Sequence, residues 1–285
     1  MTSGWLPSFK EASKAVRDAI EPLVGTRRAA EPLTVRGDGD VTRRIDAVAE
    51  KAAIEVLRQH GKPFTLISEE LGMKDYGEAK NERIVLDPID GSYNAIVGIR
   101  GYSFSVAFAD GNRLIDVNEA LVADLPGGII YEAELHKGAK LDGQTITPSK
   151  SKRLSDSTIG IDLNIVDLRS YTKNIMGILN IAKRKRHLGT NALEMCFVAS
   201  GKYDAFVDLR GVGRVTDIAA AYLILKEAGG VIVNEKGAEV DAELLPTSRL
   251  SFIAAANAYL CRNILTNLNR RKEAHLSANL GARRD

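Results

Sequence analysis

The sequence predicts an α/β protein whose first half combines helices with an antiparallel sheet and whose second half alternates strands with helices. Two segments before residue 60 carry apolar residues at helical spacing, and β-rich runs joined by short turns follow up to about residue 150. Short β-rich runs then alternate with helical segments. With 285 residues, 45% of them hydrophobic, the chain can bury a large core. We expect two packed parts, 1–150 and 151–268, followed by a polar tail, 269–285.

Two amphipathic helices are expected to open the chain. Ser8 and Glu11 have the spacing of a capping box, and apolar residues recur every three or four positions in the turns that follow. After a glycine-rich loop around residues 37–39, a second apolar stripe starts at Ile45 and stops near Gly61. We expect both helices to precede any strand.

The expected strands are short and their spacing changes between the halves. Turns such as Asp110-Gly111 and Asp142-Gly143 join neighbouring runs over few residues, which favours antiparallel pairing in the first half. The strands expected there are 64–67, 83–86, 102–109, 119–123 and 129–133. In the second half we expect strands at 158–161, 205–207, 231–233 and 252–255, and helices at 170–185, 191–200 and 216–228.

Charge and cysteine content exclude several classes of protein. The 39 basic and 37 acidic residues nearly cancel, so no overall field would attract nucleic acid or a membrane surface. No apolar run reaches the roughly 18 residues needed to span a bilayer, and the first ten residues do not resemble a signal peptide, so we expect a cytoplasmic protein. Cys196 and Cys261 are far apart and lack zinc-site spacing, and we expect two free core thiols.

The segment that follows the second predicted strand of the sheet is the most informative. An apolar run leads into Asp87, Pro88 keeps Asp87 extended, and Gly91 allows a sharp turn. Asp87 and Asp90 are thereby held together where the turn begins. If a helix starts at Ser92, its free N–H groups would bind an oxyanion beside these carboxylates.

Further acidic residues could complete a site for a hard cation. Glu69 and Glu70 follow a predicted strand, and Asp217 lies in the first turn of a predicted helix. Magnesium prefers oxygen ligands and is held by few carboxylates plus water and phosphate, so these residues suit magnesium better than zinc. Each residue also has a structural alternative: Asp87 and Asp90 as turn formers, the glutamates as a solvated strand end, and Asp217 as a helix-start charge.

The motif Asp87-Pro88-Ile89-Asp90-Gly91-Ser92 resembles the signature of the inositol monophosphatase and fructose-1,6-bisphosphatase superfamily, the lithium-sensitive phosphatases. A second signature, an Asp that opens a helix closing on Glu-Ala-Gly-Gly, is matched by residues 217–230. The resemblance runs from about residue 9 to 265. It implies a layered αβαβα sugar-phosphatase fold and magnesium-dependent hydrolysis of a phosphate monoester, with no covalent enzyme intermediate.

The resemblance also implies the metal ligands. Glu69, Asp87 and the carbonyl of Ile89 would bind a first Mg²⁺, and Asp87, Asp90 and Asp217 would surround a second. Mn²⁺ is a candidate substitute.

Three further residues are carried over from the family or differ from it. Ser92, where many relatives have Thr, would position the attacking water together with Glu69. Asp38 would bind a third metal in the manner of archaeal members; the alternative is a flexible glycine-rich turn. Thr216 stands where relatives often have Trp, which alters the packing of the pocket.

Substrate contacts are predicted at two places. The resemblance assigns substrate binding to Asp90, Gly91, Ser92, Gly189, Thr190 and Asn191. A bisphosphate needs a second anion clamp, and arginine binds phosphate through a bidentate fork. The basic candidates, each with a surface charge as the alternative, are Arg169, Lys173, Arg184, Arg186, Arg210 and Arg214. The four histidines are scattered, and we assign none a catalytic role.

The nearest resemblance is to archaeal enzymes that act on both fructose 1,6-bisphosphate and inositol 1-phosphate. We expect hydrolysis of fructose 1,6-bisphosphate to fructose 6-phosphate, and of inositol 1-phosphate, as in gluconeogenesis and carbohydrate metabolism. The alternatives are inositol monophosphatase as the main activity, an adenosine 3',5'-bisphosphate or NADP phosphatase, or a catalytically silent sugar-phosphate-binding subunit. The resemblance implies a homodimer or tetramer, and we expect no nucleic-acid or membrane partner.

Overall fold

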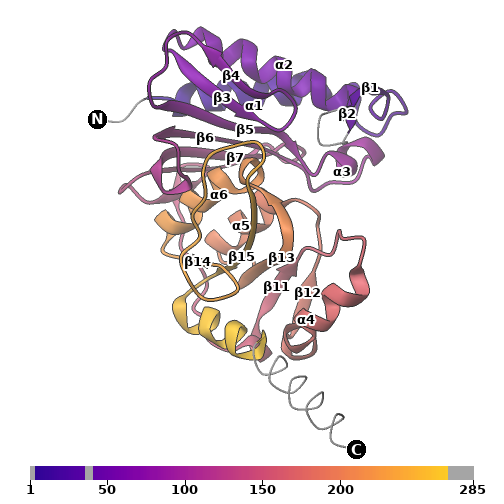
Figure 1. Ribbon diagram of the computed structural model, residues 1–285, viewed down its shortest axis with the longest axis vertical. Helices are drawn as coiled ribbons and strands as arrows, with labels where there is room; N and C mark the ends of the chain where they lie inside the picture. Colours follow the sequence, from indigo (N-terminus) through magenta and orange to yellow (C-terminus); the bar gives the residue numbers. More distant parts are fainter. Residues whose placement is uncertain (1–3, 36–40, 269–285) are drawn as a thin grey trace, which may run out of the picture.

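Helices and sheets alternate in five layers (Figure 1). The computed structural model describes residues 4–35 and 41–268; Asp38 and the polar tail 269–285 lie outside the described residues. Separate hydrophobic cores fill the space between successive layers: the outer helices against the first sheet, two buried helices between the sheets, and the second sheet against the last helices. The predicted α/β class and αβαβα layering are confirmed.

The first layer consists of α1 (Leu6–Ile20) and α2 (Arg44–Gln59). The predicted capping box is wrong, because α1 begins at Leu6 with a proline in its first turn, where no N–H is needed. The Ser8 hydroxyl instead bonds His60 Nδ1 at 2.9 Å. The expectation that both helices precede any strand is also wrong, since β1 (Pro32–Val35) and β2 (Val41–Arg43) form an antiparallel pair between them. Both strands are only three or four residues long, too short for an apolar alternation from which to predict them.

The second layer is an eight-stranded sheet in the order β10-β9-β8-β7-β6-β5-β3-β4. All neighbours pair antiparallel except β3 and β5, which run parallel because β4 pairs with the outer edge of β3. The predicted antiparallel sheet is therefore correct apart from this pair. The strands are β3 (Phe64–Ser68), β4 (Gly72–Tyr76), β5 (Glu82–Asp90), β6 (Ser103–Asp110), β7 (Val117–Asp124), β8 (Ile129–Glu134), β9 (Ala139–Leu141) and β10 (Gln144–Thr145). The short helices α3 (Ser92–Val97) and η1 (Leu114–Asp116) lie between strands.

The third layer holds α5 (Asn191–Ala199) and α6 (Val215–Ala228), buried between the two sheets. Both are apolar on nearly every side, as expected for helices covered by protein all round. Glu194 of α5 is a charged exception and is completely buried.

The fourth layer is a five-stranded sheet in the order β12-β11-β13-β15-β14, with β11 parallel to both β12 and β13. Its strands are β11 (Thr158–Ile161), β12 (Arg184–Arg186), β13 (Ala205–Arg214), β14 (Val231–Val233) and β15 (Arg249–Ala255), and η2 (Leu154–Asp156) precedes them. The last layer is α4 (Leu168–Ile181) with the helical residues 258–268. The helix predicted over 170–185 is wrong at its end, because the exposed basic residues 184–186 pair with β11 as an edge strand.

Two expectations about whole-chain properties can be compared with the described residues. Cys196 and Cys261 are both buried free thiols, as predicted. No helix in the described part of the chain is long and apolar enough to cross a membrane.

Candidate metal and phosphate site

The end of β5 fixes two carboxylates of the candidate site. The pairing of β5 with β6 shifts register between Asp87 and Asp90, and Pro88, which has no N–H to donate, lies inside this irregularity. Asp87 Oδ1 accepts the N–H of Ile89 at 3.0 Å. Asp87 is 2% exposed and Asp90 is 7% exposed, so both carboxylates lie inside the protein.

The turn after β5 requires glycine. Gly91 has a φ of 86°, and a Cβ there would lie 2.9 Å from the carbonyl oxygen of Gly101 and 3.1 Å from that of Gly189. The chain therefore turns in a space without room for a side chain. The predicted helix follows directly as α3, with the Asn94 N–H bonded to the Gly91 carbonyl at 2.9 Å.

Three elements bring three carboxylates together. Glu69 follows β3, Asp87 lies on β5, and Asp217 lies in the first turn of α6. One oxygen from each carboxylate lies within 4.8 Å of the other two. Residues separated by nearly 150 positions in the sequence thus form one acidic cluster between the first sheet and the buried helices.

The electrostatics of this cluster favour a cation. Burial raises the pKa of Asp87 well above its usual value, and repulsion from Glu69, Asp217 and Asp90 raises it further. Burial, followed by repulsion from Asp217, raises the pKa of Asp90 to about 7. Burial likewise raises the pKa of Asp217, which Arg214 partly opposes. Oxygen ligands of this kind fit a hard divalent cation. Its positive charge would offset the repulsion between the ionised carboxylates that helps to raise these pKa values.

Asp90 also joins the first sheet to α5. Its carboxylate accepts hydrogen bonds from the Thr190 hydroxyl at 2.5 Å, the Ala192 N–H at 2.7 Å and the Asn191 N–H at 3.2 Å. The sequence predicted Thr190 and Asn191 as substrate contacts, and the structure brings both of them against a predicted metal ligand. A carboxylate at the N-terminus of α5 also complements the positive end of the helix dipole.

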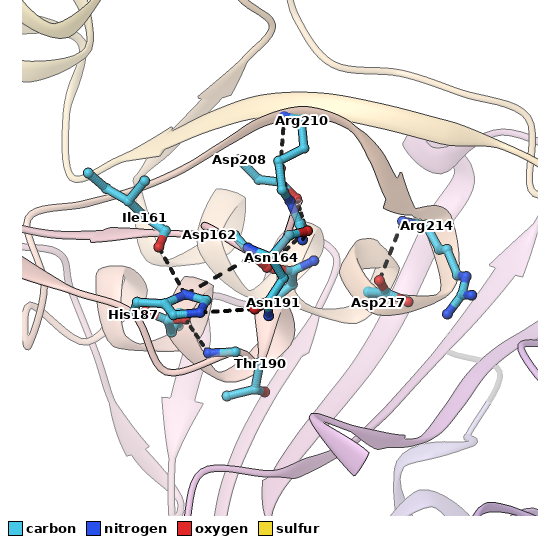
Figure 2. A network of polar contacts seen from close by, with 12 residues as sticks. Ile161, Asp162, Asn164, His187, Thr190, Asn191, Asp208, Arg210, Arg214 and Asp217 are labelled. Atoms are coloured by element: carbon cyan, nitrogen blue, oxygen red, sulfur yellow. Dashed lines mark hydrogen bonds and ion pairs between the residues drawn. The ribbon is translucent and has the colours of Figure 1, made fainter. Parts of the chain in front are cut away.

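The two arginines that precede Asp217 have different surroundings. Arg214 is partly exposed and pairs with Glu69 at the edge of the cluster. Arg210 is 8% exposed, forms a two-pronged contact with Asp208 at 2.7 and 2.8 Å, and reaches Asp162 at 2.8 Å (Figure 2). Its remaining terminal nitrogen donates to the Asn164 carbonyl. Most of the donors of Arg210 are thus already bonded within the protein.

This Arg210 network lies just beyond the end of β11, beside the register irregularity of β13 that begins at Asp208. Asp162 follows β11 and Asp208 lies on β13, while His187, after β12, bonds the Ile161 carbonyl at 3.1 Å and Asn164 at 3.3 Å (Figure 2). Ligands commonly bind at the carboxyl ends of parallel strands. The other predicted basic contacts are exposed: Arg169 and Lys173 on α4, and Arg184 and Arg186 on β12. Arg184 pairs with the first residue of β11, at the opposite end of these strands.

A cavity of about 880 Å³ opens beside the cluster, between α2 and the segment 246–249. Glu69, Glu70 and Arg214 line its inner side, and Thr42 donates from β2 to Glu70. Thr42 lies on β2, so this strand reaches the same edge of the site.

Sequence reasoning missed two residues that support the site. Asn94 of α3 donates to the Gly101 carbonyl at 2.7 Å and to the Leu188 carbonyl at 2.8 Å. Glu194 accepts hydrogen bonds from the backbone N–H groups of Leu188 and Gly189 in the same loop. A charged residue within the apolar stretch of α5 was the signal that could have identified Glu194.

Comparison with known proteins gives consistent relatives. The Inositol monophosphatase family model matches residues 6–276. A fructose-1,6-bisphosphatase/inositol-1-monophosphatase of Methanothermobacter thermautotrophicus is 38% identical over 273 residues, covering 93% of this chain and 96% of that protein. A bifunctional NADP phosphatase/NAD kinase of Methanococcus maripaludis is 36% identical, covering 85% of this chain and 45% of that longer protein.

Solved structures agree with these relatives. An inositol monophosphatase–fructose 1,6-bisphosphatase superposes with a TM-score of 0.82 at 31% identity, covering 94% of this chain and 100% of the other. A Pyrococcus horikoshii protein, described as having similarities to inositol-1 monophosphatase, gives a TM-score of 0.80 at 30% identity, covering 94% and 99%.

Proposed function

Because the chain belongs to the inositol monophosphatase family and is therefore a phosphoric monoester hydrolase, we propose that it is a Mg²⁺-dependent fructose-1,6-bisphosphatase that also hydrolyses inositol 1-phosphate. The observation that carries the proposal is the cluster of Glu69, Asp87 and Asp217, with oxygens within 4.8 Å of one another. Asp90 and the Ile89 carbonyl complete the proposed ligand set, and Asp38 is the proposed ligand for a third ion.

Magnesium held by these ligands would supply Lewis-acid chemistry, neutralising phosphate oxygens and making a bound water more acidic. The residues of the chain would do the remaining work. Glu69 would accept a hydrogen bond from the attacking water, and Ser92 would hold the same water through its hydroxyl. Gly91 and Ser92, at the start of α3, would bind the phosphate through their backbone N–H groups.

The leaving group would lie toward the second sheet. Asp90 already bonds Thr190 and the N–H of Asn191, so the segment from Gly189 to Asn191 is held beside the phosphate site. Arg214, at the edge of the cluster, is the arginine with access to a phosphate oxygen. Arg210, bonded to two carboxylates, supports the shape of this end of the site.

The substrate class rests on the relatives. Proteins 38% and 35% identical to this chain are named for both fructose-1,6-bisphosphatase and inositol-1-monophosphatase activity. An NADP phosphatase is the second candidate, favoured by the 36% identity to the bifunctional enzyme. The intact acidic cluster argues against a catalytically silent subunit.

Phosphate release with Mg²⁺ tests the proposal. Fructose 1,6-bisphosphate, inositol 1-phosphate and NADP are compared at equal concentration, each with and without EDTA. We expect release from the first two that EDTA abolishes. Release from NADP alone would replace the proposed substrate class, and release that persists in EDTA would contradict the metal assignment. Repeating the series with Mn²⁺ and Zn²⁺ tests the preference for a hard cation.

A further inference from the structure

The carboxyl group of Glu194 lies in surroundings that disfavour a charge. It lies on α5 between the two sheets and is completely buried among apolar side chains. Burial of a carboxyl without an ion-pair partner costs stability, so its presence there needs a compensating contact. The proposed ligands of the metal do not include it.

The compensating contacts lead to the substrate loop. Glu194 Oε2 accepts the N–H of Leu188 at 3.2 Å and the N–H of Gly189 at 3.3 Å. Asn94 binds the Leu188 carbonyl from the opposite side, and Thr190 donates to Asp90. Three side chains from three different elements therefore hold the loop 188–190 in one conformation.

The second sheet leaves space for this carboxyl group. A Cβ on Gly160 of β11 would lie 2.7 Å from Glu194 Oε1, and the ring atoms of Phe206 and Tyr203 would be 2.7 and 3.1 Å away. The carboxyl thus packs directly on the backbone of β11, with the loop on its other side. Its position is determined by rigid neighbours rather than by a flexible surface.

We propose that Glu194 is a positioning residue that sets the substrate-contacting loop 188–190 against the metal ligand Asp90. The inference rests on the proposed function, because this loop is the one assigned to the leaving group. Glu194 does not touch the reacting atoms. It acts through the backbone of Leu188 and Gly189, and through them on Thr190.

The charge state of Glu194 is consistent with such a role. Burial is the main cause that raises its pKa to about 8; repulsion from Asp162 on the side of β11 and Asp90 on the side of β5 adds to burial, and the two loop N–H groups oppose it. Burial also raises the pKa of Tyr203, which packs on the same face, to about 12, so this neighbour brings no charge to the site. At neutral pH Glu194 is a neutral acid, which glutamine resembles in shape and in its acceptor oxygen.

Two substitutions separate positioning from folding. Glu194→Gln keeps an acceptor for both N–H groups, and Glu194→Ala removes it. With the substrate that the wild-type enzyme hydrolyses, we expect Glu194→Ala to raise KM about tenfold, the order expected when a loop loses two hydrogen bonds, with kcat changed less than about threefold. Glu194→Gln should keep KM within about twofold of wild type at pH 7.

Glu119 supplies the matched control. It is also a buried glutamate that accepts backbone N–H groups, those of Gly4, Trp5 and Leu6, but it anchors the start of α1. Glu119→Ala should lower Tm and leave KM unchanged. A KM for Glu194→Ala that stays at the wild-type value, or that rises equally in Glu119→Ala, would overturn the inference.

Amide hydrogen exchange tests the same point without activity. Peptides covering 187–192 should exchange faster in Glu194→Ala than in Glu194→Gln, with peptides covering α1 unchanged. Equal exchange in the two variants would overturn the inference even if no substrate were turned over. Absence of turnover by the wild-type enzyme would instead count against the proposed function.

Discussion

Replacing Asp87 with asparagine should stabilise the metal-free protein while abolishing its activity. Asp87 is buried, and its carboxylate lies within 4.8 Å of those of Glu69 and Asp217. At this distance two full charges repel by about 3 kcal/mol at an effective dielectric constant of about 20. Proton uptake by Asp87 sets an upper limit on this electrostatic penalty. Keeping an aspartate protonated costs about 1.4 kcal/mol for each pH unit above its unfolded pKa of about 3.9, which is about 5 kcal/mol at pH 7.5.

Asparagine removes this penalty and keeps the oxygen that accepts the Ile89 N–H. Allowing about 1 to 3 kcal/mol for imperfect amide packing, we expect the free energy of unfolding in EDTA to rise by about 2 to 4 kcal/mol. In a chain of this size that raises Tm by roughly 4 to 8 °C. Mg²⁺ at 100 times its Kd should add about 2.7 kcal/mol per ion to the wild type, about 5.4 kcal/mol for the two proposed ions, and far less to the variant. The order of the two Tm values should therefore reverse.

The assay is thermal unfolding of both proteins in EDTA and in saturating Mg²⁺, with phosphate release measured in parallel. Asp208→Asn is the control, because it removes one charge from the buried Arg210 network and should lower Tm under both conditions. A Tm for Asp87→Asn that falls equally with and without Mg²⁺ would assign Asp87 an ordinary turn role and refute the reasoning. Substantial turnover by the variant would refute the metal assignment directly.

Three further predictions concern neighbouring features. The carboxyls of the cluster have raised pKa values, about 7 for Asp90, so they take up protons as the metal-free protein folds. Tm in EDTA should therefore fall as pH rises from about 4 through 7. Mg²⁺ should bind more tightly over the same pH range, and calorimetry in two buffers should detect the protons released on binding. A Tm in EDTA and a Mg²⁺ affinity that do not change with pH would contradict the raised pKa values. Gly91→Ala should cost about 2 to 4 kcal/mol in urea unfolding, since its Cβ would meet two carbonyl oxygens at a positive φ; a loss under 0.5 kcal/mol would show that the turn relaxes. Asp38→Ala should raise the Mg²⁺ concentration needed for half-maximal rate, and an unchanged titration would remove Asp38 from the proposed ligands.

The sequence predicted the class of fold, and it singled out the acidic residues of the candidate site, because both depend on local patterns. The apolar run into Asp87, the proline and the glycine after it act within six residues, and the structure shows the strand, the irregularity and the helix that these residues imply. The distance between Glu69 and Asp217 could not be predicted from local patterns, since it depends on how α6 packs against the first sheet. The resemblance to a known family supplied that information.

Other features were hidden for physical reasons. Residues 184–186 are three exposed basic residues whose strand conformation comes from pairing with β11, so no apolar period identified them. Arg210 was predicted as a candidate phosphate clamp from its residue type and its position just before Asp217. The two buried carboxylates that bind it, Asp162 after β11 and Asp208 on β13, belong to separate parts of the sequence and meet only in the folded protein.

The burial of α5 and α6 between two sheets has a consequence for synthesis on the ribosome. The last strand of the first sheet ends at Thr145, and α1 and α2 cover only the outer face of this sheet. Its inner face stays uncovered until α6, which ends at Ala228, has been synthesised. At about 5 to 20 residues per second, the intervening residues take roughly 4 to 17 s to emerge. During that interval the nascent chain presents a broad apolar sheet face, and this is the stage of its biogenesis at which chaperones would bind.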